Sequence, residues 1–497
     1  MTPLAAPVDW RGDKISLAKD FALHCVALLV YAECSDSMMA LFPLTSSAWG
    51  GREPVVDGFL HPDFVPVATS LRHQLEGYAG GAAVCVYHRG VCVVDLWGGV
   101  KDRAGRPWHR DTMAPSFSTT KGVASTLLHI MADRGLLKYE DTVAKHWPEF
   151  AQAGKAGITI RHVLAHQSGL YHIRQMIDHA DRMLDWEHMV RAIERTPPIH
   201  APGELSGYHG LTYGFLVGEI LQRVTGKPFS QLVQEEIAQP LGLDGMFIGA
   251  PDTALSRAAE LIWPTRGLLA RRVAIDPQVG DRLEQAAGAL RQLLLWVGVD
   301  LDLGSILDAL APRGISAFDF GAHRTLRVAI PAANGLFTAR ALARMYAALA
   351  GRGTIDGVRL LSPETVKRAA ELQCRAPRRA VLPFDMRWRL GYHGVFTTRG
   401  VPRHAFGHFG FGGSGAWADP TQELAVGLIV NSGVGTPFGD LRIARISGAA
   451  LESVAARATV RRSASLPVGA RRTTPRIAAA RPRPQPRRRL SVVSAQS

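Results

Sequence analysis

Cysteine is scarce in this sequence and forms no pattern. Five of the 497 residues are cysteines, at positions 25, 34, 85, 92 and 374, and no two of them make a CxxC pair. Proteins that depend on disulfides usually carry denser and more regular cysteines. The cysteine content therefore argues against a disulfide framework and favours reduced or buried thiols.

Long hydrophobic runs are also missing. A membrane-spanning helix needs roughly 18 apolar residues in succession, and the nearest candidate, FALHCVALLVYA at residues 21–32, is interrupted by a histidine. Lys14 and Lys19 precede it as in a secretory signal peptide, but no clean small-residue cleavage site follows. We therefore predict that residues 1–55 form an N-terminal extension without a clear signal peptide or transmembrane segment, and that the protein is cytoplasmic or peripheral.

Acidic residues disappear from the end of the chain. Residues 457–497 hold eleven arginines and neither aspartate nor glutamate, and removing those arginines from the net charge of +14 leaves about +3 on the rest. A tail rich in Arg, Pro, Ala and Ser cannot bury enough apolar surface to fold, so we predict that it is disordered. Its charge would allow contact with nucleic acid or an anionic membrane, but a solvated tail without a partner is the favoured interpretation.

The remaining sequence predicts an α+β domain over residues 56–456. AAVCVYHRGVCVVDLWGG at 82–99 has the pattern of a β-hairpin, and strand-like runs return at 413–420 and 423–432. Helices are predicted for the segments 63–78, 119–135, 211–226, 281–299 and 438–456, and an inserted helical subdomain is predicted at about 140–330. Because a hairpin implies antiparallel pairing, we expect the early hairpin and the late strands to share one antiparallel sheet flanked by helices.

Two common hydrolase signatures are incomplete. The segment Gly412-Gly-Ser414-Gly-Ala416 lacks the last glycine of GxSxG, which disfavours the nucleophile elbow of α/β-hydrolases. His162 and His166 have the spacing of a zinc-binding helix, but valine stands where HExxH needs glutamate. The two histidines are better explained by packing or exposure than by metal binding.

The stretch SFSTTKGVAS at 116–125 contains the first candidate nucleophile. Ser118 precedes Lys121 by three residues at the start of an amphipathic helix, so the amine would lie on the same face and could accept the serine proton. The alternative is that Ser118 is an ordinary N-cap. The four-residue pattern cannot decide between them, because SLAK at residues 16–19 matches it as well.

Two later segments carry further candidates. Tyr208 stands in a Gly-rich turn before a helix, and as a general base it would need a pKa well below about 10, which a nearby lysine ammonium would provide. His408 begins a glycine-dense run, HFGFGGSG, that predicts a bare strand edge where backbone N–H groups approach a ligand. Packing of the tyrosine and a surface position for the histidine remain the alternatives for each residue alone.

Taken in order, SxxK, a tyrosine in a turn and HxG resemble the motifs of the serine β-lactamase and penicillin-binding protein superfamily. The similarity is closest to the class C β-lactamase-like esterases, also called family VIII carboxylesterases. It covers roughly residues 60–450 and extends to the framework phrases LLKYEDTVAKHWPEF, ITIRHVLAHQSGL, VTGKPF and PAANGLFTARALARMYAALA.

The resemblance implies a role for each motif residue. Ser118 would be the acylated nucleophile, Lys121 the amine that deprotonates it, and Tyr208 a base in acylation and an activator of water in deacylation. His408 would take the first place of the Lys-Thr-Gly element. The backbone N–H groups of Ser118 and Phe411, the latter between Gly410 and Gly412, would form the oxyanion hole. No metal and no organic cofactor are implied.

Two departures from the family pattern bear on the substrate. Gly210 replaces the asparagine of Tyr-x-Asn, which in β-lactam-cleaving relatives helps to hold the acylamido group. His408 replaces a lysine and is largely neutral near its reference pKa of about 6.5, so it binds a carboxylate less well. Both changes favour uncharged carboxylic esters. A β-lactamase, a D-Ala-directed peptidase and a non-catalytic binding protein of the same fold remain the alternatives.

Overall fold

The structure analysed is a computed structural model that describes residues 55–77, 79–262, 303–373, 379–382, 385–432 and 441–465. These residues divide into a compact unit that ends at Val454 and a C-terminal unit that starts at Ala455. The predicted helix at 281–299, most of the N-terminal extension and the tail beyond Ser465 lie outside the described residues. In the described part of the chain, none of the helices is both long and apolar enough to cross a bilayer.

The compact unit is built on a seven-stranded antiparallel sheet with the order β1-β3-β2-β14-β13-β12-β11. The predicted hairpin is confirmed as β2 and β3, and its strand β2 pairs with the late strand β14, as expected. The strands are β1 (Val56–Leu60), β2 (Gly81–His88), β3 (Val91–Gly99), β11 (His393–Gly394), β12 (Phe406–Phe409), β13 (Gly415–Asp419) and β14 (Leu424–Val430).

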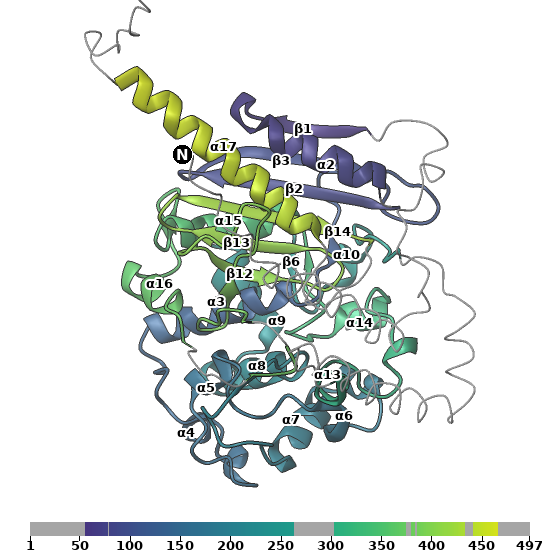
Figure 1. The fold of residues 1–497 in the computed structure, drawn as a ribbon. Helices are drawn as coiled ribbons and strands as arrows, with labels where there is room; N and C mark the ends of the chain where they lie inside the picture. Colours follow the sequence, from purple (N-terminus) through teal and green to yellow (C-terminus); the bar gives the residue numbers. More distant parts are fainter. Residues whose placement is uncertain are drawn as a thin grey trace, which may run out of the picture. The chain divides into compact units, whose positions relative to one another are not determined.

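Both faces of the sheet are covered, so its central strands are apolar throughout. Along β14, Val426 and Leu428 belong to the apolar layer on one face, whereas Ala425 and Ile429 belong to the layer on the other. Helix α2 (Val65–Gly77) and the part of α17 (Leu441–Ser465) up to Val454 cover the first face, and α15 (Ala339–Ala350) packs on the second (Figure 1). The alternation follows from side chains pointing to opposite faces of a strand.

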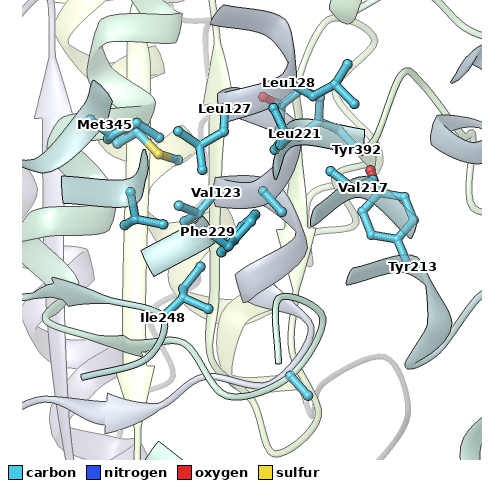
Figure 2. Close-up of a cluster of buried hydrophobic side chains, with 14 of the residues drawn as sticks. Val123, Leu127, Leu128, Tyr213, Val217, Leu221, Phe229, Ile248, Met345 and Tyr392 are labelled. Carbon is cyan, nitrogen blue, oxygen red and sulfur yellow. The ribbon is translucent and has the colours of Figure 1, made fainter. Parts of the chain in front are cut away.

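Helices fill the segment between the early hairpin and the late strands. Helix α3 (Thr119–Asp133) packs against α8 (Thr212–Thr225), and Figure 2 shows Val123, Leu127 and Val217 in the core that they share. The other helices are α4 (Val143–His146), α5 (Ile160–Leu164), α6 (Ile173–Met176), α7 (Trp186–Arg195), α9 (Phe229–Val233), α10 (Asp252–Leu255), α13 (Leu303–Leu310), α14 (His323–Arg327) and α16 (Pro363–Ala369).

Short strands tie the helices to the rest of the unit. β5 (Ser206–Gly207) pairs in parallel with β10 (Arg379–Ala380), and β4 (Ala114–Pro115), β7 (Leu336–Phe337) and β6 (Met246–Phe247) form a three-stranded sheet. β8 (Thr354–Ile355) and β9 (Val358–Arg359) form a small hairpin. Such two-residue strands have no periodicity that the sequence could reveal.

Two of the predicted helix ends agree with the structure and one does not. Gly135 and Gly226 have φ angles of 76° and 70° just after α3 and α8, as expected for glycines that end helices. Helix α17, in contrast, continues to Ser465, so the first residues of the predicted disordered tail are helical. Alanine is frequent in ALESVAARATVRRSA and arginine is a good helix former, which explains the extension.

Two of the cysteines are described by the structure. Cys85 and Cys92 are free thiols on neighbouring strands with their Sγ atoms 3.8 Å apart. These two thiols are therefore not joined in a disulfide in the described structure.

Candidate active site

Ser118 lies at the position that precedes α3, but it does not cap the helix. Its φ and ψ angles of −65° and −8° are helical and its side chain makes no capping hydrogen bond. The preceding Phe117 has a φ of 44°, a left-handed conformation that strains a non-glycine residue. The serine hydroxyl is instead turned toward Lys121 and Tyr208, so the N-cap interpretation is wrong.

Lys121 is fully buried in the first turn of α3, although lysine is rarely buried. Its Nζ lies 3.0 Å from Ser118 Oγ, 2.6 Å from the carbonyl oxygen of Gly210 and 2.9 Å from that of Ala332. Among the described residues no carboxylate pairs with this amine, and burial lowers its pKa well below 10.5. The amine is therefore held beside the serine in an environment that favours its neutral form.

Tyr208 follows β5 and reaches the same hydroxyl. Its phenolic oxygen donates to Ser118 Oγ at 2.8 Å, and its ring lies 5.2 Å from Lys121 Nζ and stacks on Trp388 with centroids 5.6 Å apart. The expectation that Lys121 lowers the pKa of this tyrosine is wrong. Burial raises the pKa above its ordinary value, and the hydrogen bond with Ser118 opposes the rise only in part.

His408 lies in β12. Contrary to the prediction, β12 is not an edge strand, because β11 pairs with its outer side. The ring is 2% exposed, and burial with the nearby His393 lowers its pKa well below 6.5. Nδ1 contacts the carbonyl oxygen of Phe409 at 3.0 Å, and Nε2 has no hydrogen-bond partner among the described residues. The structure thus joins Ser118, Lys121 and Tyr208 directly and places His408 nearby as a neutral ring that bonds to none of them.

The turn after β12 approaches the chain around Ser118 very closely. A Cβ atom on Gly410 would come within 2.2 Å of the carbonyl oxygen of Ser116, so only glycine allows this contact. Gly412 and Gly413 have φ angles of 87° and 104°, which glycine adopts readily. Among the described residues no acceptor takes the backbone N–H of Ser118. The segment 410–413 therefore lies close to the chain that precedes Ser118.

Gly210 is also fixed by its surroundings. A Cβ atom there would lie 2.2 Å from Leu310 Cδ2 and 2.8 Å from the carbonyl oxygen of Ala309, both in α13. Leu310 thus occupies the space that an asparagine side chain at position 210, the third position of the Tyr-x-Asn element, would take. The Gly210 carbonyl contributes to the site by accepting from Lys121.

Three residues contact the site in ways that the sequence did not predict. Trp388 stacks on Tyr208, the carbonyl of Ala332 accepts from Lys121, and His166 packs 5.2 Å from the Tyr208 ring. The framework phrases PAANGL and AHQSGL contain two of them, but the phrases alone did not indicate a contact with Lys121 or Tyr208.

The histidine pair that was tested for metal binding has other partners. The His162 ring forms a capping box with Thr159 at the start of α5, and His166 accepts from the backbone N–H of His209 at 3.1 Å. Among the described residues no group of three or more His, Cys, Asp or Glu side chains is arranged to hold a metal ion.

Comparison with known proteins gives consistent relatives. The profile of a family described as Beta-lactamase matches residues 67–451. The chain is 38% identical over 389 residues to the protein named esterase/beta-lactamase LipL of Mycobacterium tuberculosis, with 76% of this chain and 83% of LipL covered. Crystal structures of a penicillin-binding protein homologue from Caulobacter crescentus and of a family VIII carboxylesterase share 34% and 31% identity, with TM-scores of 0.68 and 0.67. Each comparison covers 80% of this chain and 100% of the solved structure.

Proposed function

This chain belongs to the beta-lactamase family, and we propose that within it the protein is a serine esterase that cleaves uncharged carboxylic esters through an acyl-enzyme on Ser118. The family and the α+β fold that the motifs predicted are thereby confirmed. The observation that carries the proposal is the direct contact of Ser118 Oγ with both Lys121 Nζ and the Tyr208 hydroxyl, at 3.0 and 2.8 Å. Relatives named as esterases support the choice of ester chemistry.

Lys121 acts as the base that activates the serine. A neutral amine has two N–H donors and one lone pair, and the carbonyls of Gly210 and Ala332 can only accept, so they take the two donors. The lone pair then faces Ser118 Oγ and receives its proton as the oxygen attacks the ester carbonyl. Burial favours this neutral form of the amine because it lowers the pKa of Lys121.

Tyr208 acts as a proton donor and carrier. Its raised pKa keeps it protonated, and its O–H already points at the nucleophile. When the tetrahedral intermediate collapses, the phenol gives its proton to the leaving alkoxide and regains one from the Lys121 ammonium. In deacylation the same two groups work in reverse, so that water loses a proton and Ser118 recovers one.

The backbone N–H groups of Ser118 and Phe411 stabilise the oxyanion. The close approach of Gly410 to Ser116 brings the two segments together, and the strained Phe117 fixes the first donor in place. Preorganised donors of this kind are worth about 3 kcal/mol each in the transition state.

The surroundings of the triad favour esters over β-lactams. The apolar Leu310 stands where an amide would bind an acylamido group, and the neutral His408 offers no charge to a carboxylate. We propose that small-molecule esters without a charged group beside the carbonyl are therefore the preferred substrates.

The test compares p-nitrophenyl esters of graded acyl length with nitrocefin for the wild type and Ser118→Ala. We expect ester turnover that Ser118→Ala abolishes, slow nitrocefin turnover, and a fluorophosphonate adduct on Ser118 detected by mass spectrometry. Fast nitrocefin hydrolysis with negligible ester turnover would favour the β-lactamase alternative. A folded wild type that takes no adduct at Ser118 would refute the serine mechanism.

A further inference from the structure

Tyr208 has to be held accurately because its hydroxyl must stay 2.8 Å from Ser118 Oγ. The residue that holds it lies in a different segment. His166 follows α5 with a φ of 58°, a left-handed conformation that non-glycine residues adopt at some expense in free energy. Interactions of His166 with its surroundings must offset this strain.

His166 bonds to both neighbours of the tyrosine. Its carbonyl oxygen accepts from the backbone N–H of Gly207 at 2.9 Å, and its Nδ1 accepts from the backbone N–H of His209 at 3.1 Å. One residue therefore fixes the chain on each side of Tyr208. The two bonds together restrict the rotation of the peptide planes that aim the phenol.

His209 extends this arrangement away from the active site. Its Nδ1–H donates to the carbonyl of Gly207 at 2.7 Å, and its Nε2 accepts from Ser168 Oγ at 2.6 Å and from the backbone N–H of Leu170 at 3.3 Å. These partners define the tautomers, because Nδ1 of His209 carries a proton and Nδ1 of His166 does not. Both rings are buried and neutral, with the pKa of each lowered by burial.

The His166 ring also supports the tyrosine by packing. Its centroid lies 4.1 Å from that of Trp388, 5.2 Å from Tyr208 and 5.0 Å from Tyr213. Since Trp388 stacks on Tyr208 in turn, the phenol is enclosed by rings that cannot move independently.

We propose that His166 is a positioning residue that aims the Tyr208 hydroxyl at Ser118, with His209 and Ser168 completing the support. This inference rests on the proposed function, because it assumes that Tyr208 transfers protons. The observation that carries it is the pair of hydrogen bonds from His166 to the residues on both sides of the tyrosine.

The test is a double-mutant cycle in kcat for a p-nitrophenyl ester. His166→Phe keeps an aromatic ring but removes the Nδ1 acceptor, and we expect kcat to fall roughly 10- to 100-fold, as small misplacements of a catalytic group do, with little change in KM. Because the variant acts through Tyr208, the double variant His166→Phe/Tyr208→Phe should be no slower than Tyr208→Phe alone. His166→Asn should recover most of the activity, since asparagine tolerates the left-handed conformation and offers Oδ1 as an acceptor.

His129→Phe is the matched control. His129 is buried and bonded to Tyr139 and the carbonyl of Leu390, but it does not touch Tyr208. Its effect on kcat should be small and should add to that of Tyr208→Phe. If His166→Phe does not fold, Ser168→Ala removes the distant end of the support and should also be non-additive with Tyr208→Phe.

The outcomes separate the two proposals. If Tyr208→Phe leaves kcat unchanged, the proposed role of the tyrosine fails and the inference fails with it. In a second outcome, Tyr208→Phe lowers kcat, but the effects of the His166 and Ser168 variants on kcat are fully additive with that of Tyr208→Phe. In a third outcome, His166→Asn has a kcat as low as that of His166→Phe. Either of these two outcomes overturns only the positioning role of His166.

Discussion

Replacing Lys121 with methionine tests whether the buried amine is the catalytic base. Methionine has a similar length and suits the apolar surroundings, but it has neither a lone pair for the Ser118 proton nor a donor for the carbonyls of Gly210 and Ala332. The substitution should therefore lower both activity and stability, and the two losses have separate origins.

The size of each loss follows from the contacts. General-base catalysis contributes about 10²- to 10⁴-fold to rate, so kcat/KM should fall by roughly 10³-fold, or about 4 kcal/mol of transition-state stabilisation. Each buried carbonyl left without a donor costs about 1–3 kcal/mol, and removal of the desolvated amine offsets part of this. We expect a net loss of roughly 1–3 kcal/mol in the free energy of unfolding.

Lys155 provides a matched control in the same protein. It is also fully buried, and its Nζ donates to the carbonyls of Gln152, Glu194 and Thr196 at 2.7 to 2.8 Å, away from Ser118. Lys155→Met leaves three carbonyls without this donor, so it should destabilise the fold at least as much as Lys121→Met. Its kcat/KM per folded molecule should stay near that of the wild type.

The assay combines p-nitrophenyl ester hydrolysis with urea unfolding of the three proteins. A Lys121→Met variant that is folded and retains activity within about tenfold of the wild type would refute the base assignment, because such a loss is smaller than general-base catalysis contributes. Equal activity losses in the two lysine variants would show that the effect comes from the fold.

Three further predictions concern the site. Because protonation removes the Lys121 lone pair and burial lowers its pKa well below 10.5, kcat/KM should fall as pH drops through that lowered pKa and should be level above it. A profile that still rises tenfold per pH unit close to pH 10 would contradict this. Gly410→Ala would place a Cβ atom 2.2 Å from the Ser116 carbonyl oxygen, so kcat should fall roughly 10²- to 10³-fold because the Phe411 donor moves. The control Gly157→Ala adds a Cβ atom with nothing within 4 Å and should leave kcat unchanged. Gly210→Asn should lower Tm, because its side chain would clash with Leu310 Cδ2 at 2.2 Å. Adding Leu310→Ala to this variant removes the clash and should recover part of the lost Tm. If the effects of the two substitutions on thermal unfolding are fully additive, the two residues do not compete for space.

Local patterns explain the parts of the fold that the sequence predicts well. The hairpin β2–β3 has a Gly-containing turn between two β-rich runs, and α3 and α8 show apolar stripes that end in Gly135 and Gly226. These signals come from residues close together in the chain. Strand β1 carries no such signal, since Phe59 is exposed and Gly58 interrupts the run, and it exists because β3 pairs with it.

The site shows the same division between local and distant causes. Ser118 and Lys121 were found because one helical turn relates them, and Tyr208 and His408 because the order of motifs matched a known family. The pKa of Tyr208 was predicted in the wrong direction because burial depends on chain segments such as that of Trp388, far away in sequence. The edge position of His408 was wrong for a similar reason, since the two-residue strand β11 pairs with β12. His166 was left as a packed histidine because its partners, Gly207 and His209, are some forty residues later.

The pairing of β2 with β14 has a consequence for how the protein is made. The side chain of Asn431 accepts from the backbone N–H of Gly81, 350 residues earlier, and β14 supplies one entire edge of β2. A ribosome that adds 5–20 residues per second needs roughly 20–70 s to synthesise that interval. Throughout that interval β14 has not been made, so a β2–β3 hairpin that has formed keeps one apolar strand edge unpaired, which is a template for association with other chains. Fragments that stop before Leu424 lack the partner strand of β2 and therefore leave this edge open.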